Sequence, residues 1–178
     1  QHKETGIIPI KANTVMKYSL PRILSVLAAT ERKMEWMPNL LEAYTVEKKS
    51  KYERVEYTLY DAPWPFYDRA FVISTKGRYN EKDKTIFIDI ASTEHEKVPM
   101  NPDHVRGKTY VGSIYLRGIN EEETFFEITL LTDFKGNIPS WIINMVQKKW
   151  PYKMFKNVKT QLAKDDIQIW PEFQSYDP

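Results

Sequence analysis

The sequence predicts an α+β domain in which a curved antiparallel sheet of about seven strands packs around one long C-terminal helix. Most of the chain consists of β-branched and aromatic runs separated by short polar turns, which is the pattern of consecutive antiparallel strands. The last third changes to helical spacing of its apolar residues. Because the chain has 178 residues and no internal linker, we expect one domain over 1–178.

The first part of the chain is predicted to form one strand and one short helix. Residues 6–17 read as an extended segment. Ser19 then offers an N-cap oxygen just before Pro21, which suits the first turn of the helix PRILSVLAAT. Pro38 ends any helical continuation through MEWMPNL, because proline cannot donate the next backbone hydrogen bond.

Six further runs are predicted to be the remaining strands. They are LEAYTVEKKS, ERVEYTLYD, RAFVISTKGRYN, KTIFIDIAST, VRGKTYVGSIYLRG and ETFFEITLLTDF. Several of them alternate polar and apolar residues, and their short links favour an antiparallel meander. The connection STEHEKVPMNPDH is long and polar, which is typical of a functional loop.

The end of the chain is predicted to form a long amphipathic helix. Asn137 can cap it, and Pro139 suits its first turn. Pro151 lies inside the helical pattern and should bend or divide the helix, because proline removes one hydrogen bond and clashes with the preceding turn. A helix laid across a curved sheet can leave a cavity between the two.

The composition excludes several kinds of function. Lysine and arginine exceed aspartate and glutamate by only 26 − 24 = +2, so no nucleic-acid partner is expected. The absence of cysteine excludes disulfides, thiolate nucleophiles and cysteine-ligated metals. No apolar run is long enough to span a membrane, so we expect a soluble protein. Because the chain begins with Gln1, we expect an upstream segment to have been removed; the compartment is periplasmic or secreted if that segment was a signal peptide, and cytoplasmic otherwise.

Four segments resemble the START domain family, the steroidogenic-acute-regulatory-protein-related lipid transfer family. In chain order they are EWMPNL, PWPFYDRAFV, VRGKTY and DFKGNIPSWIINM, and the resemblance extends over roughly residues 5–165. It implies a helix-grip fold, in which the sheet grips the C-terminal helix around an internal hydrophobic tunnel that holds one lipid. The implied ligand is a sterol, a phospholipid or another fatty acyl compound. We therefore expect a monomeric, non-catalytic carrier that transfers this lipid between membranes and needs no cofactor.

Ten residues are candidates for the ligand site. The rigid aromatic corner at Trp64 and Phe66 can wall one end of a cavity, or can simply plug the sheet edge as core. Arg106, with Asp89 as its partner, is a hypothetical polar contact for a lipid head group; the alternative is an outward ion pair. Tyr110 and the start of the last helix complete the set, the helical candidates being Ile138, Trp141, Ile142, Met145 and Val146. These helical residues can equally be ordinary core.

Two further segments are candidates for membrane contact. The loop residues Val98, Pro99 and Met100 correspond, by the resemblance, to a loop thought to gate the tunnel together with the last helix. The last helix also carries a basic face, with Lys149, Lys153 and Lys156 as its central members. A basic amphipathic helix can lie against anionic lipid, although a solvated lysine face is the common alternative.

Two other functions remain open. The wider helix-grip superfamily includes polyketide aromatases and cyclases, which act on apolar molecules in the same kind of cavity. For that reading His104 and Arg106 are the acid–base candidates. A ligand-sensing module that reports an apolar molecule to a partner protein is the third possibility.

Overall fold

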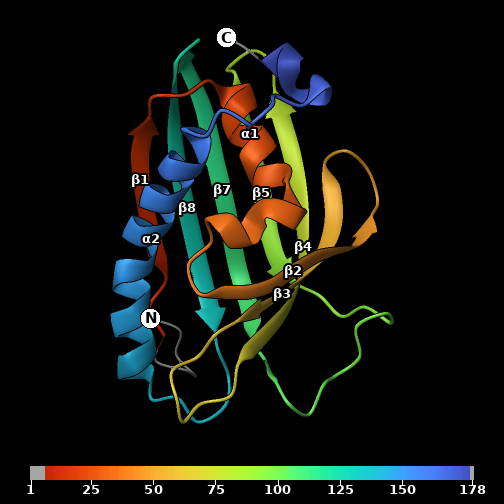
Figure 1. The fold of residues 1–178 in the computed structure, drawn as a ribbon, viewed down its shortest axis with the longest axis vertical. Helices are drawn as coiled ribbons and strands as arrows, with labels where there is room; N and C mark the ends of the chain where they lie inside the picture. The colour runs from red at the N-terminus through yellow and green to blue at the C-terminus, as the bar shows by residue number, and fades with distance from the viewer. Residues whose placement is uncertain (1–6, 177–178) are drawn as a thin grey trace.

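The strands form one sheet that curls around the C-terminal helix (Figure 1). The computed structural model describes residues 7–176. The sheet order is β1-β8-β7-β5-β4-β3-β2, with antiparallel neighbours, and a short strand β6 pairs in parallel with β4. The strand bounds are β1 Ile10–Met16, β2 Leu40–Lys48, β3 Glu53–Tyr60, β4 Arg69–Asn80, β5 Thr85–Ser92, β6 Val105–Arg106, β7 Lys108–Asn120 and β8 Glu123–Asp133. The predicted α+β class with its curved antiparallel sheet and C-terminal helix is confirmed.

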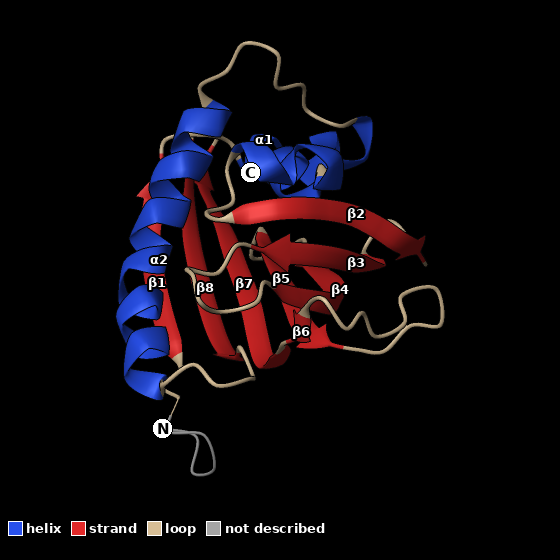
Figure 2. Ribbon diagram, turned by 60° about the horizontal axis from the view of Figure 1, so that its bottom comes forward, coloured by secondary structure: helices blue, strands red, loops and turns tan. Residues whose placement is uncertain are grey.

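The helices lie on one face of the sheet (Figures 1 and 2). Their bounds are α1 Leu20–Ala28, η1 Thr30–Glu35, α2 Ser140–Leu162 and η2 Pro171–Tyr176. Each η element is a short 3-10 helix. Helix α1 begins after Ser19 as predicted, although the serine hydroxyl makes no capping hydrogen bond. Helix α2 begins after Pro139 rather than at the predicted cap Asn137. It runs through Pro151 as one element, so this proline does not divide the helix, and the bend expected there stays a prediction.

The main core lies between the helices and the strands β5, β7 and β8. Strand alternation directs Leu116 of β7 and Phe126 of β8 toward the helices, and both side chains are fully buried. Helical spacing brings Met154, Val158 and Leu162 of α2 onto the same core. Complete burial of one such side chain stabilises the fold by about 1.5–3 kcal/mol.

A second, smaller core lies on the opposite face of β3 and β4. Its members are Val55, Tyr57, Leu59, Ala70, Val72 and Val98. Val98 belongs to the long 93–104 connection, which therefore covers the face of the sheet that points away from the helices. The side chains of β3 that belong to this core alternate with side chains that face the helices.

Gly107 explains why one predicted strand is two. A Cβ atom at this position would lie 2.3 Å from ring carbons of Phe71, so only glycine allows the chain to pass this ring. Gly107 stands between β6, which pairs with β4, and β7, which pairs with β5 and β8.

Candidate functional site

A cavity of about 240 Å³ lies between the sheet and the helices. Strands β3, β4, β5 and β8 and helices α1, α2 and η2 all contribute to its lining. Four lining residues are also exposed, namely Lys51, Tyr52, Arg78 and Val146. The cavity therefore reaches the surface beside the β2–β3 turn and beside α2.

One side of the cavity is apolar. Alternation along β5 places Ile86, Ile88 and Ile90 on it, and β8 adds Ile128 and Leu130. From α1, Leu24 and Leu27 complete this side. Such a wall favours the hydrocarbon part of a ligand, because burial of apolar surface is stabilising in proportion to its area.

The β3 side of the cavity is polar. Tyr52, Arg54, Glu56, Thr58 and Tyr60 follow one another at every second position, and all five line the cavity. The residues between them face the small outer core instead. The cavity is therefore amphipathic across its width, with β3 opposite the isoleucines of β5.

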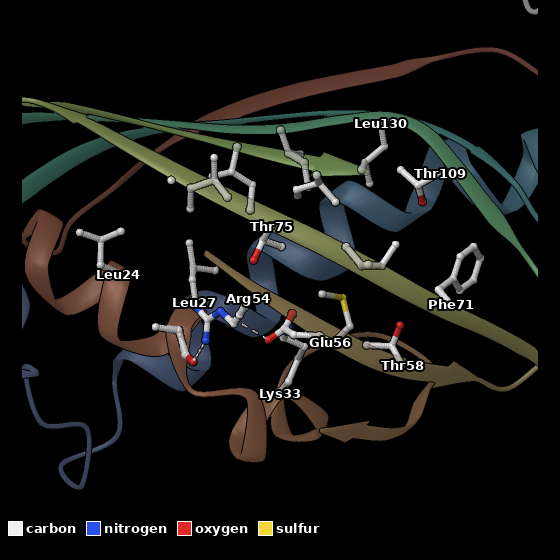
Figure 3. A pocket seen from close by; sticks show the side chains of 18 of the residues that line it. Leu24, Leu27, Lys33, Arg54, Glu56, Thr58, Phe71, Thr75, Thr109 and Leu130 are labelled. Atoms are coloured by element: carbon white, nitrogen blue, oxygen red, sulfur yellow. Dashed lines mark hydrogen bonds and ion pairs between the residues drawn. The ribbon is translucent and has the colours of Figure 1, made fainter. Parts of the chain in front are cut away.

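A buried charge cluster lies at the centre of the polar side. Lys33 Nζ lies 2.5 Å from Glu56 Oε2, and Thr30 donates its hydroxyl hydrogen to Glu56 Oε1. Arg54 Nη1 donates to the Ala28 carbonyl at 2.6 Å, and its Nε lies 3.9 Å from Glu56 Oε1. Figure 3 shows Lys33, Arg54 and Glu56 gathered on one side of the cavity, with Leu130 opposite them.

The cluster keeps Glu56 ionised. Burial alone would raise the pKa of Glu56, but the charges of Lys33 and Arg54 outweigh it and hold the pKa below its ordinary value. The cluster thus contains two cations and one carboxylate. Among the described residues, Nη2 of Arg54 donates no hydrogen bond, so this guanidinium retains donors for a ligand oxygen.

Three other polar atoms of the cavity lining are buried without a hydrogen-bond partner among residues 7–176. They are Trp36 Nε1, the Tyr79 hydroxyl and Gln147 Oε1. Gln147 Nε2 does donate to the Thr132 carbonyl at 3.2 Å, so only its oxygen is unpaired. Buried polar groups are normally paired, and unpaired ones around a cavity indicate where polar atoms of a ligand or water bind.

Of the ten predicted ligand residues, only Val146 lines this cavity. On α2, Trp141 is 68% exposed and Met145 is 51% exposed, while Ile138 and Ile142 are partly buried outside the lining. The inward face of the helix is instead marked by Ile143, Gln147 and Met154. The prediction missed this face because its second member is a polar glutamine.

The predicted polar pair is not formed. Arg106 Nη2 donates to the carbonyls of Val98 and Pro99, at 3.4 and 3.1 Å. Asp89 Oδ2 pairs with Arg78 Nη1 at 2.7 Å, near the solvent. The physical reason is that successive side chains of a strand point to opposite faces. Because the isoleucines on either side of Asp89 face the cavity, Asp89 faces away from it.

The aromatic candidates also lie outside the cavity. Trp64 is 92% exposed in the β3–β4 connection, so it is neither an end wall nor core. Phe66 is partly buried, with the Arg69 guanidinium 6.0 Å from its ring centroid. The Tyr110 hydroxyl donates to Asp133 Oδ2 at 3.4 Å.

The predicted gate loop lines a separate groove on the outer face of the sheet. Val98, Pro99 and Met100 line it together with His104 and Arg106, and its volume is about 460 Å³. The acid–base candidates of the cyclase reading therefore lie outside the main cavity. On α2, Lys149, Lys153 and Lys156 are all exposed.

Within residues 7–176 no group of acidic and histidine side chains could hold a metal ion. In the same part of the chain, no helix has the length and apolarity needed to cross a bilayer.

The fold and cavity agree with the sequence comparisons. The family model of the START domain matches residues 2–164, so the chain belongs to the START domain family. Membership of this family implies binding of a hydrophobic ligand, in agreement with the amphipathic cavity. None of the curated proteins matches the sequence significantly.

Solved structures share the helix-grip fold at low sequence identity. The structure of human STARD10 superposes with a TM-score of 0.83 at 18% identity, over 92% of this chain and 66% of that chain. A STAR-related lipid transfer protein fragment from Xanthomonas axonopodis gives 0.80 at 18% identity, over 92% of this chain and 90% of that one. The Zhui aromatase/cyclase from Streptomyces gives 0.56 at 10% identity, over 87% and 93%.

Proposed function

We propose that this protein binds one amphipathic lipid in the cavity and transfers it between membranes without chemical change. The observation that carries the proposal is the buried cluster of Lys33, Arg54 and Glu56 on one side of an otherwise apolar cavity. In this arrangement the polar group of the lipid lies against β3, and its hydrocarbon lies against β5 and β8.

The cluster suits a polar head group for an energetic reason. Charges placed in an apolar cavity are costly unless they are paired and hydrogen-bonded. Glu56 pairs with Lys33, but within residues 7–176 Arg54 Nη2 donates no hydrogen bond and stays available at the cavity lining. A hydroxyl, phosphate or carboxylate oxygen of a lipid would accept from that donor, and a plain hydrocarbon would leave it unpaired.

Exposed aromatic residues near the start of α2 support contact with a membrane. Trp64 and Tyr67 of the β3–β4 connection are 92% and 68% exposed, and Trp141 of α2 is 68% exposed. Buried Arg69 joins the β3–β4 connection to the β8–α2 connection, since it donates to the carbonyls of Tyr67 and Phe134. Tryptophan and tyrosine favour the membrane interface, and the exposed lysines of α2 favour anionic lipid.

A vesicle transfer assay tests the proposal. Wild-type protein should accelerate movement of a fluorescent phospholipid or sterol from donor to acceptor vesicles. Arg54→Leu should slow transfer and weaken binding, because it removes the free donor from the cavity. Arg106→Leu is the matched control: it removes an arginine from the outer groove and should leave both quantities unchanged. Equal behaviour of the two variants would contradict the placement of the head group.

The cyclase alternative is examined in the same samples. The likeness to the Streptomyces aromatase/cyclase concerns the fold, and its sequence identity is only 10%. Mass spectrometry of the ligand after incubation should show an unchanged mass if the protein is a carrier. A product of altered mass would favour the enzyme.

A further inference from the structure

The far end of the cavity is built from three tyrosines. Tyr52 precedes β3, Tyr79 lies on β4 and Tyr176 lies in η2, and all three line the cavity. The hydroxyl groups of Tyr52 and Tyr176 form a hydrogen bond. The rings of Tyr79 and Tyr176 stack with their centroids 4.2 Å apart, and Lys51 Nζ lies 4.7 Å from the centroid of the Tyr52 ring.

The Tyr79 hydroxyl differs from the other two. The Tyr79 hydroxyl is buried, and it forms no hydrogen bond with any residue of the described chain. The stacked Tyr176 ring holds the Tyr79 ring in place, so the hydroxyl cannot move to solvent without loss of that contact. Leaving a buried hydroxyl unpaired is destabilising, whereas a phenylalanine of the same shape carries no such cost.

Part of this end lies beyond the family match. The START model ends at residue 164, while Phe173 and Tyr176 of η2 are almost fully buried against the cavity. Two hydrogen bonds hold this segment in place. The Trp170 amide donates to Ser25 Oγ at 2.9 Å, and the Tyr176 hydroxyl bonds with the Tyr52 hydroxyl. The segment after residue 164 therefore supplies one of the three tyrosines.

The tyrosine end is separate from the charge cluster. Tyr52 lies in the bend before β3, four residues before Glu56, and Arg54 of the cluster lies between them in the chain. The wall facing this interval is apolar and includes Ile86 and Ile88. The tyrosine group therefore stands at one end of the polar β3 side, the charge cluster lies further along that side, and the cavity also has an apolar wall.

We propose that the tyrosine end is a second polar subsite, and that the ligand is a lipid with an oxygen function at both ends, such as an ω-hydroxy fatty acid. This inference rests on the proposed function, because it places the first polar end at the Lys33, Arg54 and Glu56 cluster. The distal oxygen of the ligand pairs with the Tyr79 hydroxyl, next to the Tyr52 and Tyr176 pair. Burial, with the hydrogen bond to Tyr52, raises the pKa of Tyr176 to about 12, so its hydroxyl keeps its proton at neutral pH.

The test compares ω-hydroxy fatty acids with unsubstituted fatty acids of the same length, across a series of chain lengths. Trp36 and Trp150 line the cavity, so tryptophan fluorescence reports binding of each probe. Wild-type protein should bind the hydroxylated acid of the best length about fivefold more tightly than its unsubstituted counterpart, which is the effect of one additional hydrogen bond. Tyr79→Phe should remove that preference and leave affinity for the unsubstituted acid unchanged.

The same variant makes an opposite prediction for the empty protein. Because Tyr79→Phe removes an unpaired buried hydroxyl, it should raise the melting temperature without ligand while it weakens binding of the hydroxylated acid. Tyr115→Phe, on β7 outside the cavity lining, is the control and should change neither the preference nor the affinities.

Three results would overturn the second subsite. Equal affinity of wild-type protein for both kinds of acid at every length would show that the tyrosine end does not select a ligand oxygen. An equal loss of both affinities in Tyr79→Phe would show that the hydroxyl acts only through cavity shape. In both cases the proposed carrier function stands, whereas failure to bind any acid, sterol or phospholipid would remove that function and the subsite together.

Discussion

Lys33 Nζ lies 2.5 Å from Glu56 Oε2, and this buried ion pair joins η1 to β3 at the wall of the cavity. The pair joins a short helical segment to the middle of a strand. It also explains why β3 carries charged residues on its inner side: they serve the cavity rather than the solvent.

Replacing Glu56 by glutamine should destabilise the protein by about 3 kcal/mol, because Lys33 then remains buried, and Arg54 partly buried, without their counter-charge. Urea unfolding followed by circular dichroism measures this change. The double variant Lys33→Met with Glu56→Gln should recover much of the stability, since it removes the unpaired lysine as well. Additive losses in the double variant would show that the two residues are not energetically coupled.

Acid should unfold the protein partly through Glu35. Hydrogen bonds from Arg32, Lys164 and Gln161 hold the pKa of Glu35 well below its ordinary value of 4.5. A carboxyl with a lowered folded-state pKa contributes stability above the unfolded-state pKa and loses it as the pH falls through the folded-state pKa. Stability should therefore decline below about pH 4.5, and Glu35→Gln should make that decline shallower. The unfolding free energy is measured at a series of pH values. An equal decline at acid pH in the variant and in the wild type would contradict this role.

The fold follows from the sequence more completely than the site does. Alternating runs and short turns predicted the strands, because strand pairing depends mainly on local pattern and turn residues. The inner residues of β3 could not be recognised in the same way. Arg54, Glu56 and Thr58 alternate with Val55 and Tyr57, and this pattern normally indicates a strand whose polar face meets solvent. In β3 the polar side chains face the cavity, and the apolar side chains face the 93–104 loop. This is the reverse of the usual arrangement.

The aromatic residues show a second limit of sequence reasoning. Rigid aromatic corners usually serve as packing, so Trp64 was predicted to be a cavity wall or core, yet the structure exposes it. The connection that carries Trp64 is joined through Arg69 to the β8–α2 connection. Such a contact between distant segments is not encoded in the local pattern.

The exposed aromatics should anchor the protein on membranes. The double variant Trp64→Ala with Trp141→Ala should bind anionic vesicles roughly tenfold more weakly, because two rings no longer enter the interface. Its unfolding free energy should stay close to wild type, since both side chains are exposed. Sedimentation with vesicles measures the affinity.

A matched control for this prediction is Ile119→Ala. The β7–β8 turn lies at the end of the molecule away from the start of α2 (Figure 1), and Ile119, next to this turn in the sequence, is 45% exposed. It should leave vesicle binding unchanged. If the control weakened binding as much as the tryptophan pair, the contact would not be specific to the start of α2.

Arg22 should hold the C-terminal segment in place. Its guanidinium donates to the carbonyls of Leu162, Lys164 and Ile167 at 2.8 to 3.0 Å. Arg22→Lys keeps the charge but cannot reach all three carbonyls, so we expect a loss of about 2 kcal/mol. Hydrogen exchange should become faster mainly over residues 163–176. Unchanged exchange in this segment would assign its attachment to the aromatic packing of η2 instead.

The most direct test of the ligand cavity is native mass spectrometry of the protein after incubation with mixed-lipid vesicles. The wild-type chain should retain one lipid per molecule. Thr75→Phe, which fills the cavity from β4, should retain none, whereas Ser74→Phe on the other face of the same strand should bind like wild type. No lipid on the wild-type chain, or equal occupancy in Thr75→Phe, would contradict a lipid site between the sheet and the helices.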